Sequence, residues 1–378
     1  MPESAPPRRF AALDGLRGIA VILVLVMHYY VAVPTLEGGA WHDGLKRAFS
    51  LSFCGVDLFF VLSGLLIGGI LLDFRDSPQL VPTFYRRRFF CIFPISAVLL
   101  ASFFIFRRLP ELSAIGNGAY FESPVPAWTY FGMLQNVAMS SARNVGAYWL
   151  GPTWSLAVEE QFYLFMPFLV RHLSRRGLAY LCVVAFVLCP LLRVTALLHG
   201  ENPLAAVFLL PMRAEGLLGG VLCAIALRDA RILDVLRAHC RLIGWLIAAL
   251  GAFLALFCSL NLRAGSALMA SFGYSIVSLF FVGVVLWVML FPEGKAARAL
   301  SLKPLCAMGL ISYFVYLFHN PALYALHGLI CHQLAMHFDG TGAGVTLLAL
   351  ALTVVLGGLS WRLFESPLVK LGRQRGYR

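Results

Sequence analysis

Charged residues are scarce in this chain of 378 residues. Asp, Glu, Lys and Arg make up 13% of it, whereas hydrophobic residues make up 60%. Soluble globular domains carry roughly twice that share of charged residues. The composition therefore excludes an ordinary soluble fold. It indicates a protein with many membrane-spanning helices, because each span needs about 20 mostly apolar residues.

Cysteine motifs for metal or redox chemistry are also missing. The nine cysteines are scattered, mostly inside apolar runs, and no two of them form a Cys-x-x-Cys pair. We interpret them as small hydrophobic residues and expect no metal site. The net charge of +12 does not indicate nucleic-acid binding, because the basic residues form short clusters between apolar runs. The first apolar run lacks a cleavage site after it, so we expect a retained helix.

Ten apolar segments are long enough to be membrane spans. We place them at residues 13–33, 50–72, 86–106, 153–170, 178–198, 204–228, 241–260, 268–291, 305–330 and 342–365. The predicted fold class is an all-α, multi-pass integral membrane protein, a bundle of about ten transmembrane helices. We expect one domain over residues 1–378, with its core at 11–368 and no appended soluble domain, since the last predicted span lies near the end of the sequence.

The Lys and Arg residues are distributed unevenly between the two sides that these spans define. Of the 30, 22 fall on the side that holds both termini and six on the other. Positive residues favour the cytoplasmic side, so we expect both termini in the cytoplasm. The long loop 107–152 then lies outside, and its stretch 128–137 predicts an interfacial helix. That helix either packs against the bundle or covers an acceptor site.

Ionisable residues inside the predicted spans fall into two groups by depth. Each costs about 2.5–3.5 kcal/mol in hydrocarbon, so such residues persist where they face the interior of a bundle. The helical rise predicts a polar layer in the outer half that contains His28, Asp57, Glu159, Glu160, Arg213 and His319. The second group, at the inner face, contains Asp14, Arg17, Arg86, Arg87, Arg88 and Glu365.

The first span connects these two groups. Arg17 and His28 are eleven residues apart, which places them on one face of a helix and about 16 Å apart along its axis. Arg193 lies alone in its span, and we expect it to extend toward the membrane surface. Each residue alone has a structural explanation, as an interhelical hydrogen-bonding group or an orientation signal. Their joint occurrence favours a functional site.

The residue types in the two groups suit transfer of a chemical group. An imidazole with a pKa of about 6.5 can act as a general base or nucleophile, and a nearby carboxylate such as Asp57 would orient His28. Arginines bind phosphates in bidentate fashion, so the triple arginine 86–88 suits a phosphate-bearing donor. These features predict transfer from a donor at the inner face to an acceptor above it.

Six motifs resemble those of a known family. In chain order they are "LDGLRGIAVILVLVMHYY", "GVDLFFVLSGLLIG", "FYRRRFFCIFPI", "PTWSLAVEEQFYLFMP", "ISYFVYLFHNPAL" and "FESP". Together they resemble the acyltransferase family 3 membrane O-acyltransferases, from about Asp14 to Pro367. The resemblance implies a ten-helix enzyme that delivers an acyl group, usually acetyl, from cytoplasmic acyl-CoA to a hydroxyl of a surface sugar. Acyl-CoA is then a co-substrate, and no bound cofactor is implied.

The resemblance also assigns residues by position. His28 is similar to the essential histidine of the family and Arg17 to its paired arginine. Asp57 and Glu365 match the acidic positions of the second and last spans. Arg88 matches the first arginine of an Arg-x-x-Arg motif in the third span.

One position departs from that motif. Cys91 stands where the family has the second arginine of Arg-x-x-Arg. Arg86 and Arg87 are the residues that could supply the missing charge.

Two functional hypotheses follow. In the first, the protein is an enzyme of a bacterial inner (plasma) membrane, and His28, oriented by Asp57, deprotonates a sugar hydroxyl or carries the acyl group. Its partners are acyl-CoA, a carbohydrate acceptor and the lipid bilayer, without nucleic acid. In the second, the protein is a proton-coupled transporter or a flippase of a lipid-linked sugar, and the same charges form a relay. No inverted repeat is evident in the sequence, which favours the enzyme.

Overall fold

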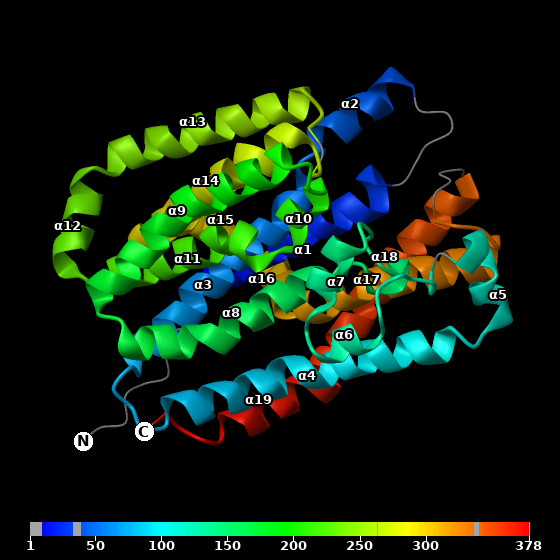
Figure 1. The fold of residues 1–378 in the computed structure, drawn as a ribbon, viewed down its shortest axis with the longest axis horizontal. Helices are drawn as coiled ribbons and strands as arrows, with labels where there is room; N and C mark the ends of the chain where they lie inside the picture. Colours follow the sequence, from blue (N-terminus) through cyan, green and yellow to red (C-terminus); the bar gives the residue numbers. More distant parts are fainter. Residues whose placement is uncertain (1–9, 33–38, 119, 263, 336–339, 378) are drawn as a thin grey trace.

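Every regular element of the computed structural model is a helix. The structure describes residues 10–32, 39–118, 120–262, 264–335 and 340–377, and no strand occurs among them. Long helices lie side by side in one bundle, and short helices join them (Figure 1). The prediction of an all-α fold is therefore confirmed.

The helices follow one another along the chain in two halves. The first half contains α1 (Ala11–Val26), η1 (Met27–Val31), α2 (Ala40–Ala48), η2 (Ser52–Cys54), α3 (Gly55–Asp73), α4 (Leu80–Phe106), α5 (Pro110–Ser113), η3 (Ile115–Gly118), α6 (Trp128–Phe131), α7 (Gln135–Ser141), η4 (Tyr148–Leu150), α8 (Thr153–His172) and α9 (Arg175–Leu198). The second half contains α10 (Pro203–Phe208), α11 (Leu210–Ala226), α12 (Ala230–Ala238), α13 (Cys240–Ser259), η5 (Met269–Gly273), α14 (Tyr274–Leu290), α15 (Lys295–Leu300), α16 (Lys303–Leu310), α17 (Ser312–Leu326), η6 (His327–Cys331), α18 (Gly340–Ser360), η7 (Trp361–Glu365) and α19 (Ser366–Arg373).

Glycines allow two pairs of helices to approach closely. A Cβ atom on Gly64 of α3 would lie 1.8 Å from the backbone oxygen of Leu217 on α11. A Cβ atom on Gly309 of α16 would lie 1.8 Å from the backbone oxygen of Asp14 on α1. In a bilayer, helices associate through such close packing, because lipid is as apolar as the helix surface. These contacts fix α3 against α11 and α1 against α16.

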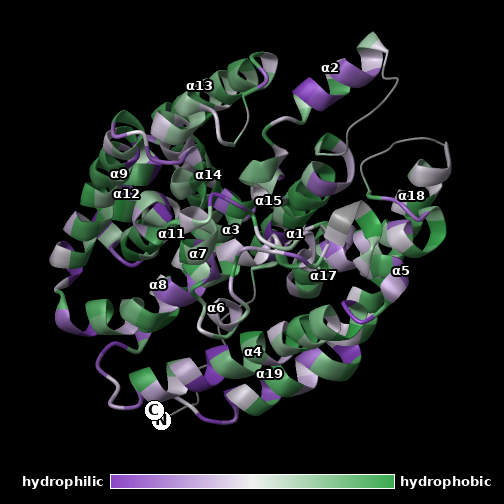
Figure 2. Ribbon diagram, turned by 45° about the vertical axis from the view of Figure 1, so that its right-hand side comes forward, coloured by the Kyte–Doolittle hydropathy of each residue, from purple (hydrophilic) through white to green (hydrophobic). Residues whose placement is uncertain are grey.

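The outer surface of the bundle is apolar. Hydrophobic residues cover the long helices, and hydrophilic residues gather in the connecting segments (Figure 2). On α13 only Phe257 is buried, and large apolar side chains such as Trp245 and Leu246 are exposed. A surface of this kind suits contact with lipid rather than with water.

Eight helical segments among the described residues are long and apolar enough to cross a membrane. The pair Lys303–Leu310 and Ser312–Cys331, bent by 72°, makes a ninth if it is counted as one span. The predicted segment 153–170 is also helical, as α8, but its two glutamates make it too polar to be counted. The structure thus supports a multi-pass membrane protein, while the number ten and the cytoplasmic side of the termini stay predictions.

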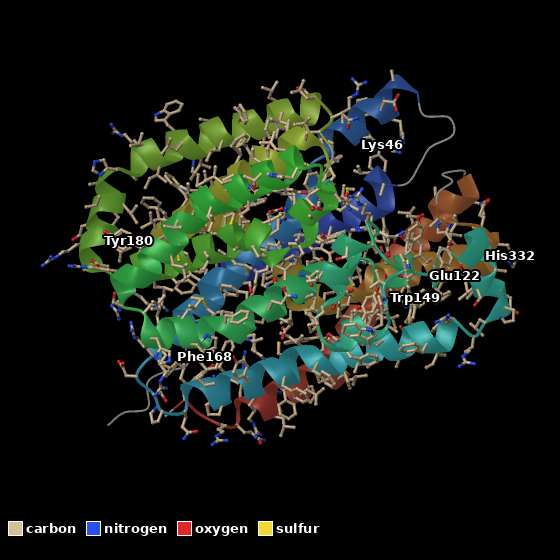
Figure 3. All side chains as sticks on the ribbon, viewed as in Figure 1. Lys46, Glu122, Trp149, Phe168, Tyr180 and His332 are labelled. Carbon is tan, nitrogen blue, oxygen red and sulfur yellow. The ribbon has the colours of Figure 1, made fainter. Side chains whose placement is uncertain are left out.

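The segment 107–152 folds into short helices rather than a single interfacial one. The predicted helix at 128–137 is divided into α6 and α7 by a turn in which Met133 has a φ of 52°. The Trp149 ring is buried in this segment beside the Phe121 ring. Glu122, Trp149 and His332 lie toward one end of the bundle, and Tyr180 lies at the other (Figure 3). The segment therefore covers one end of the molecule.

Candidate active site

Two histidines from distant parts of the chain meet inside the bundle. The ring centroids of His28 and His319 are 4.6 Å apart, with the rings nearly perpendicular. The Nδ1 atom of His28 lies 2.9 Å from the carbonyl oxygen of Val24, and that of His319 lies 2.7 Å from the carbonyl oxygen of Tyr316. A carbonyl oxygen only accepts, so we infer that each Nδ1 carries the proton. Each Nε2 is then an acceptor, and that of His319 is buried without a hydrogen-bond partner.

A local change of helix geometry holds this pair in place. His28 lies in η1, a π-helical turn of five residues, and such turns occur frequently at functional sites. The next residue, Tyr29, donates its hydroxyl proton to the backbone oxygen of His319 over 2.8 Å. The same hydroxyl lies 3.3 Å from the Thr353 hydroxyl of α18. These bonds join α1, α17 and α18 around the two imidazoles.

Asp57 has a different partner from the predicted one. Its Oδ1 atom accepts a hydrogen bond of 2.8 Å from Nη2 of Arg213, and both side chains are almost fully buried. The Arg213 guanidinium also lies over the Tyr274 ring, 3.7 Å from its centroid. No hydrogen bond joins Asp57 to His28 in the described part of the chain, so Asp57 does not orient the imidazole directly. The close packing of α3 on α11 brings Asp57 to Arg213 instead.

A second buried ion pair lies beside the first. Nη1 of Arg193 donates to Oε1 of Glu215 over 2.9 Å, and the Arg193 side chain has no exposed surface. Ser275 accepts from Arg193 over 2.7 Å and donates to Glu215 over 3.0 Å. The prediction that Arg193 extends toward the membrane surface is therefore wrong. Glu215, two residues after Arg213, was the signal for a partner.

One face of α8 carries a line of polar groups. Ser155, Glu159 and Tyr163 are spaced four residues apart, so they lie one above another on the helix. The Tyr316 hydroxyl bonds to Ser155 at one end of this line. At the other end, the Tyr163 hydroxyl donates to Glu159 over 2.9 Å and lies 2.5 Å from the Ser63 hydroxyl. Because Tyr316 precedes His319 by one turn, the line begins beside the histidine pair.

Arginines stand at the far end of that line. Arg17 and Arg88 both interact electrostatically with Glu159, and Arg88 does so with Glu160 as well. Arg17 also interacts with Glu365, a buried carboxylate that accepts a hydrogen bond of 2.8 Å from a serine hydroxyl. Glu159 and Glu160, which we had expected to face the histidines, therefore face the two arginines.

The other two arginines of the triplet have a separate role. Nη2 of Arg87 donates to the backbone oxygen of Arg375 over 3.0 Å, and its guanidinium lies 4.3 Å from the centroid of the Tyr377 ring. Arg86 donates to the backbone oxygen of Leu371 over 3.5 Å. Both hold the C-terminal segment against α4. Of the three arginines predicted to bind a donor, Arg88 is the one that interacts with the carboxylates of α8.

Two further residues from the sequence analysis lie near these groups. Asp14 lines a cavity of about 300 Å³ between α1 and α16, together with Cys306 and three other residues. Cys91 is half-buried one turn after Arg88 and interacts with it electrostatically. A thiol at this position supplies no second guanidinium.

The predicted site residues thus form three groups: the histidine pair, the two buried ion pairs, and the carboxylates with Arg17 and Arg88. Sequence reasoning missed Tyr163 and Tyr316, which connect the first group to the third. Their signal was spacing, because Tyr163 follows Glu159 by four residues and Tyr316 precedes His319 by three. The arrangement offers unpartnered acceptor nitrogens at one end of a polar line and two guanidinium groups at the other.

Fold and site together define a helical, multi-pass membrane protein with an internal line of ionisable residues. Residues 10–362 match the family described as the acyltransferase domain, and the chain belongs to that family, as its motifs predicted. It is 28% identical to the O-acetyltransferase OatA of Staphylococcus aureus, over 97% of this chain and 58% of that protein. It is 26% identical to the peptidoglycan O-acetyltransferase OatA of Listeria monocytogenes, over 96% and 56%. The chain therefore spans less than two thirds of the length of these relatives. No solved structure matches it.

Proposed function

We propose that this protein is a membrane O-acyltransferase that moves an acyl group from cytoplasmic acyl-CoA to a hydroxyl of a carbohydrate. The observation that carries the proposal is the buried contact between His28 and His319, in which both Nε2 atoms are left as acceptors. Family membership supports acyl transfer. The names of the two relatives make acetyl the first group to test and a peptidoglycan glycan the first acceptor. We place the protein in a bacterial inner or plasma membrane, since it has eight candidate spans.

The donor binds at the arginine end of the polar line. Arg17 and Arg88 provide two guanidinium groups that suit the phosphates of acyl-CoA, because arginine binds phosphate through paired hydrogen bonds. The carboxylates of Glu159 and Glu365 interact with Arg17 and hold it in the bundle before the donor arrives. Asp14, on the same helix as Arg17, lies at the same end of the site.

The reaction takes place at the histidine pair. Nε2 of His28 accepts the proton of the acceptor hydroxyl, and the hydroxyl oxygen forms a bond with the thioester carbonyl carbon. The bond between that carbon and sulfur breaks, and the CoA thiolate takes the proton from the imidazolium. Nε2 of His319 accepts a hydrogen bond from the His28 imidazolium while it carries the proton. Asp57 contributes by holding Arg213, which keeps α3 in place beside α1.

The test uses purified protein in lipid nanodiscs, radiolabelled acetyl-CoA and glycan fragments. We expect the wild type to label the glycan and the His28→Ala variant to lose at least 10²-fold in rate, the usual contribution of a general base. His199→Ala is the matched control, because the His199 Nδ1 makes the same bond to the carbonyl four residues earlier but the side chain is exposed. Unchanged labelling in a folded His28→Ala variant would contradict the proposal.

One observation favours the transport alternative. The 72° bend between α16 and α17 resembles the broken helices that line substrate sites in transporters. A proton-coupled transporter or flippase would move a lipid-linked sugar in vesicles in response to a pH gradient and without a covalent product. Such movement by the wild type, with no labelled glycan in the acetyl-CoA assay, would favour transport over acyl transfer.

A further inference from the structure

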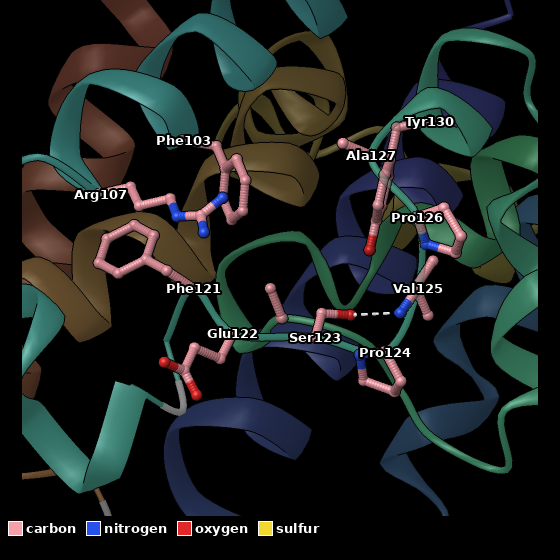
Figure 4. Close-up of a pocket in the computed structure, with 11 residues that line it drawn as sticks. Phe103, Arg107, Phe121, Glu122, Ser123, Pro124, Val125, Pro126, Ala127 and Tyr130 are labelled. Carbon is pink, nitrogen blue, oxygen red and sulfur yellow. Dashed lines mark hydrogen bonds between the residues drawn. The ribbon is translucent and has the colours of Figure 1, made fainter.

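A pocket of about 650 Å³ lies outside the histidine site, between the end of α4 and the segment 121–130. Figure 4 shows the side chains that line it, which come from α4, from the segment before α6 and from the residues before α8. Its volume falls within the range of pockets that bind small ligands. The segment that forms it is the one predicted from the sequence as a loop packed on the bundle or covering an acceptor site.

The pocket combines aromatic faces with polar groups. The rings of Phe103 and Phe121 lie 5.6 Å apart at 51° and form one apolar wall. Arg107 and Glu122 line the pocket with exposed side chains, and neither makes an ion pair with another described residue. A site with apolar faces and a few charged or hydroxyl groups suits a ligand that has both apolar faces and hydroxyls, as a sugar ring has.

Tyr130 contributes a hydroxyl that makes no hydrogen bond in the described part of the chain, although it is buried. Ser123 Oγ lies nearby and accepts a hydrogen bond of 3.0 Å from the backbone nitrogen of Val125. Gly146, with a φ of +76°, leaves room for the phenol, since a Cβ atom there would lie 2.8 Å from the Tyr130 hydroxyl oxygen. Burial raises the pKa of Tyr130 to about 12, so the hydroxyl keeps its proton at neutral pH. A buried hydroxyl without a partner indicates a missing ligand.

The pocket is fixed to the helix that carries His319. Ala147 lines the pocket, and the backbone oxygen of the next residue, Tyr148, accepts a hydrogen bond of 3.0 Å from the Asn320 amide. Asn320 directly follows His319. In the same segment, the Tyr120 ring stacks on that of Tyr324 at 4.9 Å. A ligand in the pocket is therefore held in a fixed position relative to α17.

We infer that this pocket binds one sugar unit of the acceptor glycan, next to the unit whose hydroxyl receives the acyl group. The sugar ring packs against Phe103 and Phe121. The Tyr130 hydroxyl and the Arg107 guanidinium donate to its oxygens, and Glu122 accepts from its hydroxyl or amide groups. This inference rests on the proposed function insofar as it takes the acceptor to be a carbohydrate, and it predicts that longer acceptors bind better than single sugars.

Binding can be measured without acyl transfer, so the two proposals can fail separately. The probes are chitotetraose, maltotetraose and a tetramer of galacturonate, titrated into wild-type protein in nanodiscs without acyl donor. We expect at least one tetramer to bind at least tenfold more tightly than its monomer. Tyr130→Phe and Arg107→Gln should each weaken that binding about three- to tenfold. His28→Ala should bind the tetramer as the wild type does, even where it transfers nothing.

Matched controls test the site rather than the fold. Arg108→Gln removes a neighbouring exposed arginine that does not line the pocket, and Phe131→Ala removes an exposed ring of α6. Both should bind the tetramer as the wild type does. In the transfer assay, Tyr130→Phe should raise KM for the tetramer and leave kcat and the rate with a single sugar unchanged. Binding of none of the three tetramers, or equal binding by Tyr130→Phe, Arg107→Gln and wild type, would overturn the inference.

Discussion

Replacing Asp57 by asparagine tests whether this carboxylate acts through Arg213. The two side chains are 2% and 3% exposed and are joined by a hydrogen bond of 2.8 Å. Removing one partner of a buried ion pair costs about 3–5 kcal/mol, because the other charge stays buried. We expect the lower end, about 3 kcal/mol, because the Tyr274 ring still faces the guanidinium and asparagine keeps one acceptor oxygen.

The double variant separates this effect from others. In Asp57→Asn with Arg213→Gln no charge remains, so we expect the free energy of unfolding to recover by about 2 kcal/mol relative to Asp57→Asn alone. Equilibrium unfolding in mixed micelles measures the cycle. As a control, Asp73→Asn breaks the pair with Arg228, whose side chains are 51% and 28% exposed, and should cost less than about 1 kcal/mol. Additivity of the Asp57 and Arg213 effects within about 0.5 kcal/mol would refute the reasoning.

The same variants decide what Asp57 does in the reaction. If it acts through Arg213, acyl transfer should fall in Asp57→Asn and return in part in the double variant. If Asp57 instead contacted the reacting atoms, the double variant would stay inactive although its stability recovered. The assay is transfer of labelled acetyl to a glycan, with each rate normalised to the amount of folded protein.

Three further outcomes are expected. Gly64→Ala should destabilise the protein by about 1–3 kcal/mol because it separates α3 from α11, whereas Gly358→Ala, whose Cβ would meet no atom within 4 Å, should not; equal unfolding curves would contradict this. Arg88→Lys should raise KM for acetyl-CoA about tenfold or more through loss of paired hydrogen bonds, and Arg86→Lys should leave it within about twofold; equal effects would place the donor elsewhere. His319→Gln should lower kcat about tenfold at constant KM for the donor, because a hydrogen bond to a charged imidazole contributes about 1.5 kcal/mol, and an unchanged kcat would exclude that bond.

Depth along the membrane could be predicted from the sequence, whereas the direction of each side chain could not. Counting residues places His28 and His319 at a common depth, and their rings are in contact. The same count gives Asp57 a depth but no partner, because the partner depends on which helix lies beside α3. That neighbour is set by a backbone contact at Gly64, which no periodicity in the sequence encodes. Arg193 was misread for the same reason, since its partner belongs to α11.

Polarity gives α8 its place in the bundle. Ionisable side chains exposed to lipid cost about 2.5–3.5 kcal/mol each, so a helix with Glu159 and Glu160 in its middle must face protein. The structure packs it against α3, α4, α7, α10 and α11. The bonds from Ser155 to Tyr316 and from Tyr163 to Ser63 then use its polar face. The same residues that keep α8 from resembling a lipid-facing span allow it to connect the arginines to the histidine pair.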